Sequence, residues 1–192
     1  MDGTSLRAHA ASAPSPEHIP TLRSQYRRRS WVREGIEARP SPLGGRGLFT
    51  RVRIEAGEQV IEWGGELFSA QQLAEGVPRE NSLATLGEGL YVGSRPETPV
   101  DLCEFMNHAC TPNLWLIDEK TLVARRLILP EEELTADYAS FESDPRWEMP
   151  CACGAPGCRR LITGKDWALP EVMTRLAGHL SPYLLARLKA GV

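Results

Sequence analysis

Three cysteines lie within eight residues in the run CACGAPGC. Cys151, Cys153 and Cys158 would supply three thiolates, and two glycines between them let the backbone turn tightly. Three thiolates occupy three corners of a tetrahedral zinc site, and a structural site needs a fourth ligand. Cys103, Cys110 or a histidine could supply it. The alternative is a loop of free thiols, a less common role for so tight a cluster in a reducing cell.

Three other segments carry groups that could do chemistry. NHACTPN, residues 107–113, crowds amide, imidazole and hydroxyl groups together, although a well-satisfied turn is the alternative. EELTADY ends in the phenol of Tyr138, which could equally be an aromatic at a strand edge. GGRGLF, residues 44–49, permits close backbone approach to a ligand. It lacks the third glycine and the following helix of a dinucleotide fingerprint.

Short strands and tight turns must position these segments. Glycine (17) and proline (15) are frequent, which favours many strands and loops over a helical bundle. The pattern predicts strands near Leu48, at 60–63 and around 90–93, and a hairpin that turns at 118–120. It predicts three short helices. The first has Ser69 as its N-cap, the second begins at Pro170 and stops at Gly178, and the third follows Ser181.

Length and composition narrow the class of protein. The chain has 192 residues, a hydrophobic fraction of 42% and a formal net charge of −3. The charge argues against a general nucleic-acid binder, and no apolar run is long enough to span a membrane. Five cysteines without an export signal argue against a disulfide framework. Residues 1–20 predict a disordered lead, and the arginine-rich stretch 23–33 predicts a solvated connector or an arm for an acidic partner or localisation.

Taken in order, the motifs GRGLF, EWGGEL, LYVG, FMNHACTPN, ELTADY and CACGAPGC resemble the SET-domain protein lysine methyltransferases that carry a post-SET zinc motif. The resemblance covers about residues 36–162. It implies a mainly β fold of small curved sheets, in which the segment ending in ELTADY forms a pseudoknot with the loop carrying NHACTPN. It also implies S-adenosylmethionine on one face and a target lysine that enters a narrow channel from the other.

The resemblance assigns roles to the matching positions. Tyr138 is implied as the catalytic tyrosine. The implied cofactor-binding residues are Gly44, Arg46, Tyr91, Asn107 and His108. One structural zinc ion per chain is implied at Cys110, Cys151, Cys153 and Cys158. The implied residues of the substrate channel are Trp63 and Ala136, and Cys103 is expected to be an ordinary buried thiol.

Four departures from the family pattern concern the substrate. Trp63 replaces a channel tyrosine, and Ala136 replaces an aromatic residue that narrows the channel. We expect the smaller side chain to admit a methylated lysine and give di- or trimethyl product, while the indole works against this. Glu104 replaces a common arginine, and no cysteine-rich segment precedes residue 36. The degree of methylation and the identity of the substrate are therefore left open.

The predicted organisation is a disordered, basic lead (1–34), a SET domain (35–142), a post-SET zinc-binding segment (143–164) and a C-terminal helical extension (165–192). The predicted activity is S-adenosylmethionine-dependent methylation of a lysine ε-amine in a histone-like or other basic protein. A catalytically weak SET-fold module that binds peptides or partners is the alternative. We expect no sequence-specific nucleic-acid binding, no membrane association and a cytoplasmic location, or a nuclear, chromatin-associated one in a eukaryote.

Overall fold

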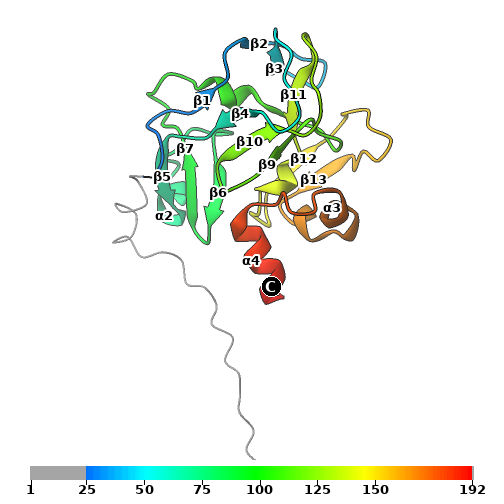
Figure 1. Ribbon diagram of the computed structural model, residues 1–192. Helices are drawn as coiled ribbons and strands as arrows, with labels where there is room; N and C mark the ends of the chain where they lie inside the picture. Colours follow the sequence, from blue (N-terminus) through cyan, green and yellow to red (C-terminus); the bar gives the residue numbers. More distant parts are fainter. Residues whose placement is uncertain (1–24, 192) are drawn as a thin grey trace, which may run out of the picture.

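Small β-sheets dominate the computed structural model, which describes residues 25–191 (Figure 1). The first sheet has the order β1 (Trp31–Val32), β4 (Gln59–Glu62), β10 (Thr121–Ala124) and β9 (Leu114–Leu116). The second has the order β2 (Ile36–Pro40), β3 (Arg46–Thr50), β11 (Glu133–Ala136) and β8 (Asn107–His108). The smaller sheets contain β5 (Glu66–Ser69), β7 (Leu90–Gly93) and β6 (Ala84–Gly87), and β12 (Glu148–Pro150) with β13 (Leu161–Thr163). The expected mainly β fold is confirmed.

The second sheet brings distant motifs together. Its strand β11 pairs antiparallel with β3 and parallel with β8. Thr135 and Ala136 therefore lie opposite Asn107 and His108. The segment that ends at Tyr138 thus runs beside the NHACTPN segment, as the expected pseudoknot requires.

The β9–β10 hairpin turns where the sequence predicts. Asp118 Oδ1 accepts hydrogen bonds from the backbone N–H groups of Lys120 (2.9 Å) and Thr121 (2.6 Å). An aspartate that binds the backbone two and three residues ahead fixes a tight turn without glycine. Leu116 and Leu122 become cross-strand partners, and both point into the core.

Helices occupy the periphery, and their ends follow capping chemistry. The hydroxyl of Ser69 accepts from the N–H of Gln72 at the start of α2 (Ala70–Ala74). Prolines open α3 (Pro170–Arg175) and α4 (Pro182–Ala190), and Gly191 ends α4 at φ 73°. Both lie at the end of the molecule opposite β2 and β3 (Figure 1). Three 3₁₀ turns cover Leu102–Phe105, Tyr138–Ser140 and Asp166–Ala168. No helix within 25–191 is both long and apolar enough to cross a membrane.

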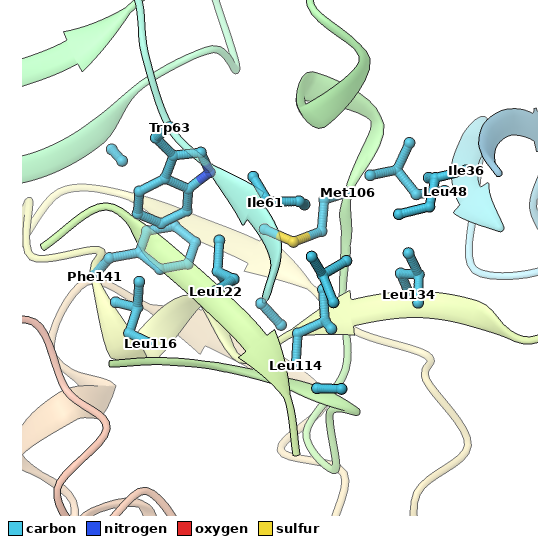
Figure 2. Close-up of a cluster of buried hydrophobic side chains, with 14 of the residues drawn as sticks. Ile36, Leu48, Ile61, Trp63, Met106, Leu114, Leu116, Leu122, Leu134 and Phe141 are labelled. Atoms are coloured by element: carbon cyan, nitrogen blue, oxygen red, sulfur yellow. The ribbon is translucent and has the colours of Figure 1, made fainter. Parts of the chain in front are cut away.

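Three clusters of buried side chains hold these elements together. The largest draws side chains from the first two sheets and from the β5–β7–β6 sheet, and includes Leu48, Leu114 and Leu134, each fully buried (Figure 2). Full burial of such a side chain stabilises the fold by about 1.5–3 kcal/mol. A second cluster joins α3 and α4 to Ala139, next to Tyr138. A third surrounds Cys110 and includes Ile162 of β13.

Residues 25–34 belong to the folded domain, so the prediction of a disordered lead is wrong for this part of 1–34. Trp31 and Val32 pair with β4 and extend the first sheet. Arg29 Nε donates to Asp101 Oδ1 (2.7 Å), and Arg27 Nε donates to Glu62 Oε2 (3.0 Å). Two of the arginines that suggested a solvated connector, Arg27 and Arg29, therefore have carboxylate partners in the folded domain. The remainder of the predicted lead, 1–24, lies outside the described residues.

Candidate functional site

A cavity of about 590 Å³ lies where β7, the segment 101–107 and the segment 138–149 meet. Five residues with an implied role line it: Arg46, Trp63, Tyr91, Asn107 and Tyr138. Sequence reasoning missed other lining residues, among them Phe105, Met106, Phe141, Glu142 and Trp147. Gly44, His108 and Ala136 do not line this cavity.

Tyr138 is held at both ends. Its backbone N–H donates to His108 Nδ1 (3.1 Å), and its hydroxyl donates to the carbonyl of Met106 (2.6 Å). Asp137 caps the 3₁₀ turn that begins at Tyr138. Burial, with a smaller effect from the charge of Glu133, raises the pKa of the phenol. The site therefore presents an oriented, neutral hydroxyl on the cavity wall.

Asn107 links β8 to β3 and β11. Its Nδ2 donates to the carbonyl of Arg46 (3.0 Å) and to Glu133 Oε1 (2.8 Å). A Cβ on Gly47 would overlap this Glu133 oxygen and crowd Asn107 Nδ2, so close packing requires glycine there. Gly44 instead lies at the exposed end of the β2–β3 hairpin, with open space around it. Both glycines occur in GGRGLF, but spacing alone could not show which one meets Glu133.

The His108 side chain is buried beside the cavity. Its Nδ1 accepts from Tyr138, so the neutral ring carries its proton on Nε2, which lies 3.4 Å from Cys110 Sγ. Burial, and then the charges of Arg159 and Arg175, lower the pKa of His108 to about 3. The imidazole thus connects the tyrosine turn to the cysteine cluster, and only the backbone of His108 remains for a cofactor.

Four cysteines form the cluster that the motifs predicted. The Sγ atoms of Cys110, Cys151, Cys153 and Cys158 lie within 4.8 Å of one another. Cys151 Sγ is 4.0 Å from that of Cys110 and 3.7 Å from that of Cys158. Tetrahedral zinc with bonds of about 2.3 Å to sulfur requires sulfurs about 3.8 Å apart. The donor set and its spacing fit one structural zinc ion. Cys103 lies elsewhere, with its Sγ 3.1 Å from Ser30 Oγ.

The ionisation of these thiols depends on a cation. Burial raises the pKa of Cys110 and of Cys151, so neither favours the thiolate by itself. A backbone hydrogen bond at Arg160 contributes most to lowering the pKa of Cys158 to about 7. The backbone N–H of Arg159 also donates to Cys110 Sγ (3.4 Å). Metal binding would therefore release protons from the buried thiols.

Aromatic side chains form one wall of the cavity. The rings of Trp63 and Phe141 meet edge to face with centroids 4.8 Å apart, and the Phe141 centroid is 5.5 Å from that of Tyr138. Trp147 lies 6.1 Å from Tyr138 on the same measure. Ala136 is fully buried in the large core cluster, so its small side chain does not widen this cavity. The aromatic pair of Trp63 and Phe141 bounds the space instead.

A second cavity, of about 830 Å³, lies between the β6–β7 turn and α4. The two cavities share Thr85, Tyr91 and Asp144 as lining residues. The hydroxyl of Tyr183 in α4 donates to Glu88 Oε2 (2.6 Å) in the turn. Burial, and then the charge of Asp144, raise the pKa of Tyr91. We call this second space the outer cavity and the first, of about 590 Å³, the inner cavity; an aromatic ring and a carboxylate lie where their linings overlap.

A family model and the sequence relatives both place this chain among SET-domain proteins. Residues 45–139 match the model of the SET domain. Histone-lysine N-methyltransferase 2B of Homo sapiens is 33% identical over 144 residues, which cover 68% of this chain and 5% of that protein. The H3 lysine-4 specific histone-lysine N-methyltransferase of Mycosarcoma maydis is 36% identical over 138 residues, 64% of this chain and 9% of the relative. The chain thus spans a small fraction of these relatives.

Solved structures share the fold. KRYPTONITE, in a complex with mCHG DNA and SAH, superposes with a TM-score of 0.53 at 25% identity, over 68% of this chain and 29% of that one. The methyltransferase domain of human SETMAR gives a TM-score of 0.56 at 23% identity, over 67% of this chain and 58% of that one.

Proposed function

Because residues 45–139 make this chain a member of the SET-domain family, we propose that it transfers methyl groups from S-adenosylmethionine to the ε-amine of a lysine in another protein. The observation that carries the proposal is the neutral phenol of Tyr138, held on the cavity wall by Met106. The relatives named histone-lysine N-methyltransferases support the same reaction.

The inner cavity offers groups for the cofactor. Both hydrogen bonds of the Asn107 side chain use Nδ2, so within residues 25–191 its Oδ1 is left to accept from a ligand ammonium group. On the same wall, Arg46 Cζ lies over the Phe105 ring, 4.4 Å from its centroid, and both side chains would flank the cofactor. When bound, S-adenosylmethionine supplies a methyl group on a positively charged sulfur. KRYPTONITE, which was solved with SAH, supports this ligand class.

The protein must then bind a neutral lysine amine, although the usual lysine pKa is about 10.4. Trp63 and Phe141 give the cavity an apolar wall, which disfavours the ammonium form. The oxygens of Tyr138 and Met106 present partial negative charge to the positive charge that moves during transfer. Because both oxygens are already fixed, they stabilise the transition state without rearrangement.

The metal has a structural role in this scheme. Cys110, Cys151, Cys153 and Cys158 would occupy all four positions of the zinc ion, so none is open for water or substrate. Zinc would fix the segment between β12 and β13 against His108, which contacts Tyr138.

We propose a basic, histone-like segment as the substrate. The lysine would pass from the outer cavity, past Asp144 and Tyr91, to the inner one. Glu142 is a further carboxyl group that lines the inner cavity. The names of the relatives support a histone, and the carboxylates support a positively charged peptide.

The test uses the full, zinc-loaded chain with S-adenosylmethionine labelled in its methyl group. Core histones and a lysine-rich peptide library serve as acceptors, and mass spectrometry identifies the modified residue. We expect label on lysine in the wild type. We expect Tyr138→Phe to lower kcat by about 10²–10⁴-fold, because it removes only the hydroxyl.

Calorimetry with S-adenosylhomocysteine separates the outcomes. Full affinity without transfer to any acceptor would favour the partner-binding module over the enzyme. Full activity in Tyr138→Phe would contradict the role of the phenol. Neither affinity nor activity in a folded, zinc-loaded chain would overturn the proposal altogether.

A further inference from the structure

Arg159 follows the zinc ligand Cys158 but reaches away from the metal. Its side chain is 8% exposed. Its Nη1 and Nη2 donate to the two carboxylate oxygens of Asp137 at 3.0 and 2.6 Å. A planar guanidinium that binds both oxygens fixes the orientation of the carboxylate as well as its position.

Asp137 in turn shapes the turn that carries Tyr138. It is 1% exposed, and its Oδ1 accepts from the backbone N–H of Ala139 (3.1 Å), which caps the turn. This bond and the His108–Tyr138 bond hold the backbone on both sides of the phenol. A displaced Asp137 would therefore reorient the tyrosine without any change in the cavity wall opposite.

The C-terminal extension completes the charge balance of this network. Asp166 Oδ2 lies 2.9 Å from Arg159 Nε in an ion pair, and its Oδ1 accepts from the hydroxyl of Thr163 (2.7 Å). Arg175 Nη2 lies 3.5 Å from Asp137 Oδ2. Two arginines thus balance two aspartates in a nearly dry region, where loss of one partner leaves a buried charge uncompensated.

Arg159 also contacts the cysteine cluster. Its backbone N–H donates to Cys110 Sγ at 3.4 Å, while its side chain holds Asp137. Arg159 is therefore one residue away from a zinc ligand in sequence, in contact with another in space, and bound to the cap of the tyrosine turn.

We propose that Arg159 is a positioning residue for methyl transfer, which sets the orientation of Tyr138 through Asp137 and makes that orientation depend on the zinc-bound segment and the C-terminal extension. This inference rests on the proposed function. A phenol displaced by about 1 Å is enough to reduce a rate about 100-fold.

The variants are Arg159→Lys, which keeps the charge but not the paired hydrogen bonds, and Arg159→Met. Arg160→Lys and Arg160→Met are matched controls, because Arg160 is the exposed neighbour in the same loop. We expect kcat to fall about 10- to 100-fold in both Arg159 variants. We expect KM for the peptide, affinity for S-adenosylhomocysteine and one zinc per chain to be retained, and the controls to match the wild type.

A readout without turnover makes the test independent of the proposed function. The chain has four tyrosines, so 3-fluorotyrosine labelling gives four ¹⁹F NMR signals, and Tyr138→Phe identifies one of them. We expect Arg159→Lys to shift or broaden the Tyr138 signal and leave the others unchanged. If Arg159→Met does not fold, Asp166→Asn should give the same change with a smaller amplitude.

Two results would overturn the inference. One is an unchanged Tyr138 signal in Arg159→Lys. The other is a loss of cofactor affinity or zinc in proportion to kcat, which would show a general structural role. An inactive wild type whose Tyr138 signal still responds to Arg159→Lys would refute the proposed function and leave the positioning established.

Discussion

Glu142 is a carboxyl group whose position opposes its ionisation. It lines the inner cavity, and burial raises its pKa although its Oε1 accepts N–H bonds from Ser143 (2.7 Å) and Asp144 (2.8 Å). A raised pKa in the folded state favours folding when the group is protonated, and that contribution is lost as the pH rises. The charged form at neutral pH is therefore a cost to stability in a place where it can attract a lysine.

Glu142→Gln should accordingly stabilise the protein at neutral pH. The amide oxygen can accept the same two N–H bonds, while the buried negative charge is gone. We expect a higher midpoint of thermal unfolding than in the wild type at pH 8, and a smaller difference at pH 5, since the carboxyl has a usual pKa of about 4.3. Zinc-loaded protein is used throughout. Exposed Glu148→Gln is the control, and a lower midpoint for Glu142→Gln at pH 8 would contradict the reasoning.

The number of methyl groups transferred should depend on the Trp63–Phe141 pair. Phe141→Leu removes part of the wall, so we expect a larger fraction of di- and trimethyl-lysine under excess cofactor. Ala136→Val adds volume within the core, so we expect reduced stability and an unchanged product distribution. Mass spectrometry of a peptide product measures the product distribution of both variants. If the product distribution changed only in Ala136→Val, residue 136 rather than Phe141 would limit the space for methyl groups.

At the scale of elements, the β12–β13 pair depends on the metal. These strands pair only with each other in the described chain, and an isolated two-stranded hairpin is marginally stable in water. We expect a chelator to increase hydrogen exchange first in residues 148–163, before the first two sheets respond.

Cys110→Ser should lose the zinc ion, and Cys103→Ser should keep it, by elemental analysis. The reverse pattern would refute the ligand assignment.

Local chemistry explains which elements the sequence predicts well. The β9–β10 turn, the Ser69 cap and the start of α4 each depend on residues a few positions apart. The pattern does not predict β1, β5, β6, β8, β12 or β13, because their partners and buried faces come from tertiary contacts rather than from alternation.

In the site too, the sequence predicts what depends on motifs and spacing and misses what depends on tertiary contacts. Motif order and cysteine spacing brought Cys110 and the triplet together, and sequence alone left the fourth ligand open between residue types. Spacing could not place the side chain of His108 behind the cavity or distinguish Gly47 from Gly44. Nor could it show that Phe141, rather than position 136, meets Trp63. These facts depend on strands that are distant in sequence.

At the scale of the whole molecule, the C-terminal extension packs against the SET domain. Leu184 of α4 is fully buried in the cluster that contains Val172, Leu176 and Ala139. We expect Leu184→Ala to lower the free energy of unfolding by about 2–5 kcal/mol, as measured by urea denaturation. Leu161→Ala is the control, because Leu161 is 46% exposed. A change below about 1 kcal/mol for Leu184→Ala would separate the extension from the core.

Other properties at this scale stay predictions. They include the cytoplasmic location, the functional division at residues 142 and 164, and the absence of sequence-specific nucleic-acid binding. Fractionation of cells that express the tagged chain addresses the first of these.

The position of β11 between β3 and β8 also determines when the chain can fold. About 80 residues separate β3 from β11, so during synthesis β3 waits with an open edge until the later strand has emerged. Pairing across such a distance is slow, because a long loop must close before any contact rewards it. An exposed strand edge is meanwhile a template for other chains. The arrangement that unites the two motifs therefore leaves β3 with an unpaired edge in any nascent chain that ends before residue 133.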